Sequence, residues 1–157
     1  MVSTLEIARK ARLSVIRMTA HAKAAHTASS LSLIDILSVA YSHLDNPNSN
    51  NLPLGDRILI SKGHAAAGVY AVMAEYGILP MDWLDTYCDD DAPLNGHVTR
   101  HGVPGVSLST GSLGHALPFA VGQAHARKLQ QVESKVFVII SDGECDEGSN
   151  WEAALVG

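Results

Sequence analysis

The residues best suited to chemistry follow the most apolar run of the chain. Residues 135–140 (KVFVII) predict a buried parallel strand, and Ser141-Asp142-Gly143-Glu144 comes directly after it. Ligands of open α/β sheets bind beyond the carboxyl ends of the strands. Asp142 would suit a hard cation such as Mg²⁺ there, and Gly143 would let a backbone N–H approach a phosphate oxygen. An ordinary strand-to-helix turn explains the same residues, because Asp-Gly is a common turn dipeptide.

Acidic and large apolar residues alternate at the end of the chain. The acidic residues are Asp142, Glu144, Asp146, Glu147 and Glu152. Because Trp151 and residues 153–155 (AAL) stand among them, the pattern predicts an interface in which carboxylates are buried and their pKa values raised. A calcium-binding EF-hand is excluded, since Gly148 comes one place late and Ala153 occupies the position of the bidentate ligand.

Several histidines stand at predicted loops and helix starts, beside small residues. They are His26, His64, His97, His101 and His115. A single histidine is usually an ordinary surface or core residue, but a group at strand-to-helix junctions favours ligand binding. A zinc site from Cys88, His97 and His101 is disfavoured, because His-x3-His needs a helix and residues 102–105 (GVPG) interrupt one.

Two other enzyme classes are excluded by their missing motifs. Gly111-x-x-Gly114 is not the glycine fingerprint of a dinucleotide-binding domain, which argues against a dehydrogenase. Ser109 and Ser112 lack the G-x-S-x-G turn of an α/β-hydrolase.

The hydrophobic pattern predicts alternating helices and strands, typical of an α/β fold with a parallel sheet. Residues 26–30 should break the first helical pattern, residues 45–51 should form a surface loop, and residues 89–110 should be irregular. Helices are expected over residues 7–22, 33–41, 65–75, 81–87 and 116–129 and from 148 onward, and strands over 57–61 and 135–140.

The composition limits the kinds of molecule that the chain is expected to bind. Its 157 residues carry a formal net charge of −5 and only 17% charged residues, below the roughly 25% usual for soluble domains. A low share of charged residues leaves little polar surface, which favours a partner protein that covers one face of the chain. No basic stripe suits nucleic acid, and no run of about 18 apolar residues would span a membrane. Two cysteines and a start without a secretory signal predict a soluble, cytoplasmic protein.

Four segments are weak motifs singly but specific together, because of their order and spacing. They are residues 25–29 (AHTAS), 56–64 (DRILISKGH), 104–114 (PGVSLSTGSLG) and 141–153 (SDGECDEGSNWEA). Together they resemble the N-terminal, diphosphate-binding half of a transketolase, and are most similar to split, two-chain transketolase-like proteins. The resemblance implies a three-layer, thiamine diphosphate-binding α/β fold with a parallel sheet flanked by helices. It also implies transfer of a two-carbon ketol unit between sugar phosphates.

The resemblance assigns cofactor roles to the matched residues. Asp142 would coordinate Mg²⁺ (or Ca²⁺ or Mn²⁺) bound to the diphosphate, which Gly143 and His64 would also contact. The backbone shelf against the aminopyrimidine ring would comprise Gly111, Ser112 and Leu113.

The same resemblance assigns roles in catalysis and assembly. His26 and His97 would face the substrate and assist proton transfer. Glu147 and Glu152 match the interface carboxylates of the family. The partner would be a C-terminal pyrimidine-domain chain or a second copy in a homodimer. Gly96-His97-Val98-Thr99 stands where many members have Gly-His-Pro-Glu, so donor and acceptor sugars stay open.

The length of the chain leaves three functional hypotheses. Residues 1–157 would be a partial diphosphate-binding domain truncated at the C-terminus, because an asparagine metal ligand and the pyrimidine-binding domain of the family are missing. The chain would then be inactive alone and act within a larger assembly. The alternatives are a non-catalytic stub that binds a partner chain and a metal-free module that binds sugar phosphates. An unpaired sheet edge also predicts a poor monomer.

Overall fold

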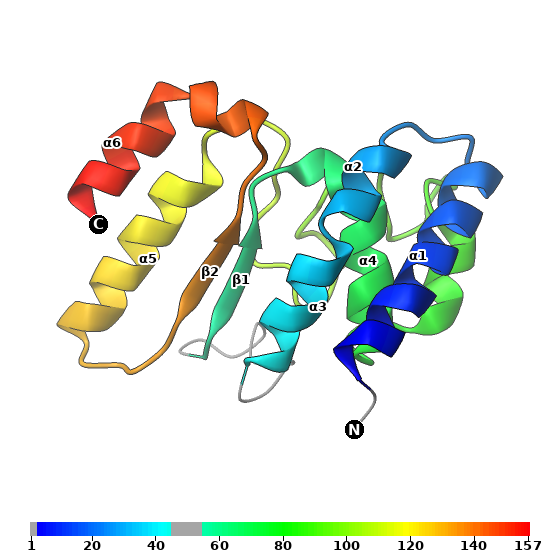
Figure 1. Ribbon diagram of the computed structural model, residues 1–157, viewed down its shortest axis with the longest axis horizontal. Coiled ribbons are helices and arrows are strands. Elements are labelled where there is room, and N and C mark those ends of the chain that lie inside the picture. Colours follow the sequence, from blue (N-terminus) through cyan, green and yellow to red (C-terminus); the bar gives the residue numbers. More distant parts are fainter. Residues whose placement is uncertain (1–2, 45–54) are drawn as a thin grey trace.

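A computed structural model describes residues 3–44 and 55–157. The loop expected at residues 45–51 lies outside the described residues. Figure 1 shows most helices on one side of a small sheet and two on the other. The first group comprises α1 (Thr4–His21), α2 (Thr27–Ser32), α3 (Ile34–Ser42) and α4 (Ala66–Glu75), and the second comprises α5 (Ala116–Leu129) and α6 (Gly148–Val156).

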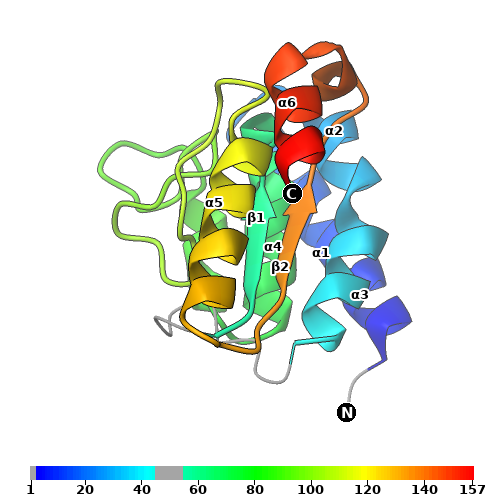
Figure 2. The same ribbon diagram turned by 90° about the vertical axis from the view of Figure 1, so that its left-hand side faces the viewer.

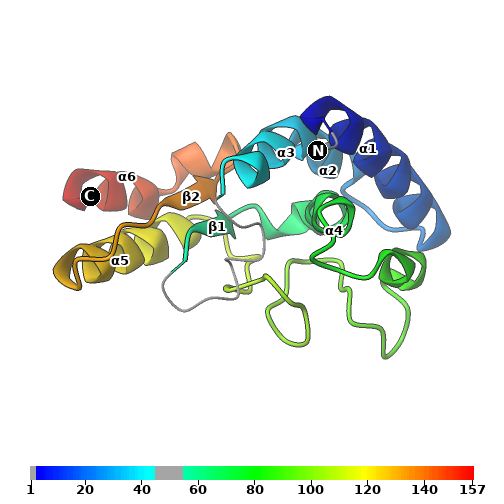
Figure 3. The same cartoon turned by 90° about the horizontal axis from the view of Figure 1, so that it is seen from below.

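Two parallel strands form the sheet. β1 (Arg57–Ile60) pairs with β2 (Val136–Ile139), with Arg57 opposite Val136 and Ile60 opposite Ile139. The strands lie between α5 on one face and α3 on the other (Figures 2 and 3), and α5 packs against both. Helices on both faces of a parallel sheet confirm the predicted α/β class.

The two strands differ in burial. All four residues of β1 are buried, whereas Val136, Phe137 and Val138 of β2 are only half-buried. Among the described residues β2 pairs only with β1, so its second edge carries no strand. An apolar strand with one unpaired edge is a surface that other protein segments can cover.

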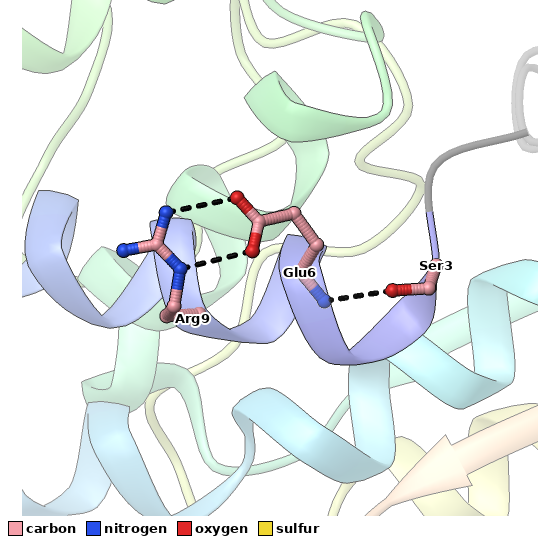
Figure 4. Close-up of polar contacts among 3 residues, drawn as sticks. All are labelled: Ser3, Glu6 and Arg9. Carbon is pink, nitrogen blue, oxygen red and sulfur yellow. Dashed lines mark hydrogen bonds and ion pairs between the residues drawn. The ribbon is translucent and has the colours of Figure 1, made fainter.

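Helix α1 begins at a capping residue. The Ser3 hydroxyl accepts a hydrogen bond from the Glu6 N–H at 3.2 Å (Figure 4). Arg9 donates to both Glu6 carboxylate oxygens, at 2.9 and 2.8 Å. The pair lies one helical turn apart on the exposed side of α1, while Ala11 and Val15 face the core. The amphipathic helix predicted for this segment is confirmed.

Helix α4 is the centre of the core. Every residue from Ala66 to Ala74 is buried, with α1, α2 and α3 packed around it. Gly68 allows one close approach, because a Cβ atom there would lie 2.4 Å from the Ser30 carbonyl oxygen of α2. Although α4 is apolar throughout, no helix in the described ranges combines the length and apolar character needed to span a bilayer.

The break predicted at residues 26–30 is wrong in extent. Of these five residues only His26 lies outside a helix, with φ +70°, and α2 begins at Thr27; the chain leaves α1 earlier, after His21. Thr27 donates to the Thr19 hydroxyl of α1 at 3.0 Å, and Ser30 is buried beneath α4. These tertiary contacts stabilise a helix that its small polar residues do not favour by themselves.

Three short 3₁₀ helices complete the described elements. η3 (Met81–Thr86) replaces the short helix expected over residues 81–87. η2 (Gly63–Ala65) and η4 (Gly143–Asp146) follow the carboxyl ends of β1 and β2. Both ends lie at the top of Figure 1, close to the start of α2. The segments expected to carry chemistry therefore meet at one end of the molecule.

Candidate functional site

Three histidines from separate segments meet at this end. The His26 ring lies 5.3 Å from the His64 ring and 6.0 Å from the His97 ring, measured between centroids. His26 precedes α2, His64 belongs to η2, and His97 lies in the long loop after η3. His26 and His97 are exposed and His64 is half-buried. Three of the five histidines predicted from the sequence are therefore brought together, and two of them are exposed.

The loop that carries His97 is fixed from below by a buried tyrosine. The Tyr70 hydroxyl donates to the His97 carbonyl oxygen at 3.1 Å and accepts from the Thr99 N–H at 3.2 Å. Burial of the ring raises the pKa of Tyr70 to about 12, although the hydrogen bond from Thr99 opposes this shift. The hydroxyl thus stays protonated and can serve as donor and acceptor at once.

The pKa of His64 lies below its ordinary value. Burial is the main cause, and the nearby Lys62 ammonium, His26 and His97 add to it, whereas the Glu144 carboxylate opposes it. Lys62 is itself buried and donates to the Ser32 hydroxyl at 3.0 Å. A bound anion would act in the opposite direction. Its negative charge beside His64 and the Lys62 ammonium would favour the protonated form of the His64 ring.

The segment 111–114 is joined to the histidine loops through backbone contacts. Thr110 donates to the Val98 carbonyl at 3.0 Å, and Val98 donates to the Gly63 carbonyl at 3.0 Å. Gly63 is required here, since a Cβ atom would lie 2.2 Å from the Thr110 carbonyl oxygen. Beyond this junction Gly111 and Ser112 are exposed and Leu113 is half-buried. Residues 111 and 112 are thus accessible to a ligand while the chain before them is held in place.

Asp142 and Gly143 lie where the sequence places them, beyond the carboxyl end of β2. Asp142 is exposed and makes no capping hydrogen bond to η4. Gly143 is also exposed, and no heavy atom lies within 4 Å of the position that a Cβ atom would take. Packing within the chain therefore gives no reason for a glycine at this position, whereas the close approach of a ligand would.

The surroundings of Asp142 fit a metal ion shared with a phosphate group. Within residues 3–44 and 55–157, no cluster of three or more His, Cys, Asp or Glu side chains could hold a metal ion. Mg²⁺ commonly binds through one or two protein carboxylates together with phosphate oxygens and water. One exposed carboxylate beside an open glycine can supply the protein part of such a site, but not a complete metal cage.

The prediction that buried carboxylates in this segment have raised pKa values is wrong for Glu144. Glu144 is fully buried, whereas Glu147 and Glu152 are exposed, as is Asp146. Burial by itself would raise the pKa of Glu144, but hydrogen bonds from Ser61, Gly114 and Ser141 outweigh it, and the pKa is lowered. Glu144 is therefore held as an anion by its donors.

The remaining histidines at predicted junctions do not join this group. His101 is exposed in a turn, and the His115 Nδ1 lies 2.8 Å from the Leu113 carbonyl oxygen. His97, His101 and Cys88 form no metal cluster among the described residues.

Sequence reasoning missed several residues that organise the site. Ser61, Lys62 and Tyr70 are buried and polar, and each makes a hydrogen bond to a segment remote in the sequence. Ser61 and Lys62 carried a signal, since Ser61 is the last residue of the strand predicted over residues 57–61 and Lys62 follows it directly. Nothing in the sequence distinguishes Tyr70 from an ordinary core residue.

A separate groove lies away from this end. It has a volume of about 810 Å³ and lies between α1, the end of α4 and η3, with Lys10, Arg17, Glu75 and Asp82 among its lining residues. Its basic side chains come from α1 and its acidic side chains from α4 and η3, and none of the predicted site residues lines it.

Comparison with known proteins agrees with the resemblance. Residues 3–157 match the family described as "Transketolase, thiamine diphosphate binding domain". The chain is 44% identical over 151 residues to a subunit of the apulose-4-phosphate transketolase of Actinobacillus succinogenes, covering 94% of this chain and 55% of that protein. It is 36% identical over 132 residues to the SqwG subunit of the 6-deoxy-6-sulfo-D-fructose transketolase of a Clostridium species, covering 83% and 48%.

The solved structures show the same likeness. The crystal structure of transketolase from Campylobacter jejuni superposes with a TM-score of 0.86 at 30% identity, covering 98% of this chain and 26% of that one. The chain therefore spans about half the length of the two subunits above and about a quarter of this transketolase. The chain belongs to the transketolase family, in its thiamine diphosphate-binding domain.

Proposed function

We propose that this chain is the diphosphate-binding part of a transketolase-type enzyme that transfers a two-carbon ketol unit between sugar phosphates. The observation that carries the proposal is the meeting of His26, His64 and His97 beyond β1, with Asp142 and Gly143 beyond the same end of the neighbouring parallel strand β2. Its membership of the transketolase family and the names of its relatives support the reaction class.

The proposed cofactor is thiamine diphosphate held with Mg²⁺ or a similar divalent ion. Asp142 would bind the metal, while Gly143 and His64 would contact the diphosphate. Residues 111–113 would present their backbone to the aminopyrimidine ring. Bound thiamine diphosphate would supply the carbanion chemistry, and the protein would supply shape and charge neutralisation.

His26 and His97 are proposed to act on the sugar. Both rings are exposed and lie together beside His64. In that position they could hold hydroxyl groups of the substrate and move protons to and from them. Two histidine rings do not by themselves distinguish one sugar from another, so the proposal extends to sugar phosphates as a class.

A partner chain is part of the proposal. Two relatives are named as subunits of transketolases. On this chain α5 and α6 carry exposed apolar residues, including Phe119, Leu155 and Val156, and a shallow pocket of about 440 Å³ lies between the two helices. Glu147 and Glu152 lie exposed at the start of α6 and within it, where they could face a partner.

Calorimetric titration with thiamine diphosphate tests the proposal directly. Binding is expected in the presence of Mg²⁺ and should be lost with a chelator or in Asp142→Asn. The matched control is Asp146→Asn, which removes an exposed carboxylate four residues further along and should bind normally. Binding that ignores chelator would favour the metal-free sugar-phosphate module. A folded chain that binds neither metal nor cofactor would favour the non-catalytic stub.

A further inference from the structure

Glu144 is a buried carboxylate for which the proposed chemistry has no use. Its side chain is fully buried, while Asp142 and Asp146 on either side of it are exposed. An unpaired buried carboxylate is costly unless hydrogen bonds satisfy it. The hydrogen-bond partners of the Glu144 carboxylate therefore indicate its structural role.

Four hydrogen bonds reach the Glu144 carboxylate. Oε1 accepts from the Ser61 hydroxyl and, at 3.0 Å, from the Gly114 N–H. Oε2 accepts from the N–H and the hydroxyl of Ser141, at 2.8 and 3.0 Å. An ionised carboxylate only accepts hydrogen bonds and has about four sites for them, so these donors satisfy it completely. Bonds of this kind are stronger than those between neutral groups.

The backbone around the carboxylate is held equally well. Asn150 donates from Nδ2 to the Glu144 carbonyl oxygen at 2.7 Å, and Ser149 donates to the Gly114 carbonyl oxygen at 2.6 Å. Gly114 has φ +76°, and a Cβ atom there would lie 2.7 Å from Cβ of Glu147. The start of α6 thus fixes both Glu144 and the segment that Glu144 binds.

The donors belong to three segments that are far apart in the sequence. Ser61 directly follows β1 and leads to His64. Gly114 closes the segment 111–114, and Ser141 leads directly to Asp142. Each segment carries residues that the proposed function assigns to the cofactor. One carboxylate is therefore bonded to the base of every one of these loops.

We propose that Glu144 is a positioning residue that sets the relative placement of the diphosphate-contacting loops after β1 and β2 and of the shelf at residues 111–113. The inference rests on the proposed function for the identity of the ligand, and on the contacts alone for the joining of the loops. A carboxylate is suited to this task because it accepts from several directions at once, whereas an amide must present a donor on one side.

Glu144→Gln tests the role at nearly constant volume. Its NH₂ group would face either the Ser141 donors or those of Ser61 and Gly114. The dissociation constant for thiamine diphosphate with Mg²⁺ should rise about tenfold or more, at a temperature where circular dichroism shows a native fold. Asp146→Asn makes the same chemical change on an exposed side chain and should leave the constant unaltered. A Glu144→Gln chain that is less stable but binds normally would overturn the proposal.

Amide NMR spectra of the ligand-free chain separate this inference from the proposed function. Glu144→Gln should shift the amide resonances of residues 62–64 and 111–114 together, and the Asp146→Asn control should not. Should wild type fail to bind thiamine diphosphate, the proposed function fails, while these shifts still support the joining of the loops. Shifts confined to residues 141–145 would contradict it.

Ser61→Ala provides a second variant in case Glu144→Gln does not fold. It removes one donor and leaves the carboxylate and its other partners in place. Ser61 and Gly114 share the oxygen Oε1 of Glu144, so loss of the hydroxyl should shift the Gly114 amide resonance across the carboxylate. A Gly114 resonance unchanged in Ser61→Ala would overturn the proposal.

Discussion

The two sides of the sheet differ in how completely they are closed. On one side α4 is buried from Ala66 to Ala74 beneath α1, α2 and α3. On the other, only Asn150 and Ala153 of α6 are buried, and Leu155 and Val156 are 88% and 80% exposed. The closed side is an ordinary hydrophobic core that supports the site. The open side presents apolar surface of the kind that partner proteins cover.

The largest expected effect comes from a pair of leucine substitutions. Leu37 is fully buried in α3, whereas Leu155 of α6 is exposed. Leu37→Ala should lower the free energy of unfolding by about 2–5 kcal/mol, because it removes buried methyl groups and leaves a cavity. Leu155→Ala should change it by less than about 0.5 kcal/mol. Urea unfolding measures both, and similar losses in the two variants would show that the open side is already packed.

A pair of glycine substitutions compares a closely packed backbone position in the core with an open one at the candidate site. A Cβ atom at Gly68 would collide with the Ser30 carbonyl oxygen, while the position at Gly143 is open. Gly68→Ala should cost about 1–3 kcal/mol of stability. Gly143→Ala should be neutral or stabilise by up to about 1 kcal/mol, since it restricts the unfolded chain.

The second glycine variant should nevertheless affect the ligand. If Gly143 leaves room for a diphosphate, Gly143→Ala should weaken binding of thiamine diphosphate while the melting temperature holds or rises. Normal binding by this variant would count against a diphosphate at that position. Thermal unfolding and calorimetric titration of the same sample give both values.

The smallest expected effect is a dependence of stability on pH through His64. Because its folded-state pKa is lowered from the ordinary value of 6.5, the unfolded chain takes up a proton first as the pH falls. The associated stability is present above about pH 6.5 and is lost as the pH falls through the folded-state pKa. Wild type should lose more stability than His64→Asn between pH 7.5 and 5.5 in urea unfolding. Equal losses of stability in wild type and His64→Asn would contradict the inference that the surroundings of His64 disfavour its charged form.

Most elements could be predicted because their signals are local. The apolar run before Ser141 and the glycine at position 77 locate β2 and the end of α4 with little need for tertiary information. α2 could not be predicted from Thr27 and Ser30, because contacts with α1 and α4 stabilise it.

In the candidate site, too, some features follow from local sequence and others depend on tertiary contacts. Asp142 and the histidines follow predicted elements, and their residue types indicate chemistry. The state of Glu144 depends on Ser61 and Gly114, which lie 83 and 30 positions away in the sequence. A pattern of neighbouring acidic residues contains no information about donors that distant, so the direction of its pKa shift could not be foreseen.

The loops beyond the carboxyl ends of β1 and β2 are proposed to bind thiamine diphosphate together with a divalent metal. Mapping of amide resonances during titration with Mg²⁺ and thiamine diphosphate tests it most directly. Resonances of residues 62–64, 111–114 and 142–143 should shift, and those along the groove between α1 and η3 should not. Shifts along that groove, with the three loops unaffected, would contradict it.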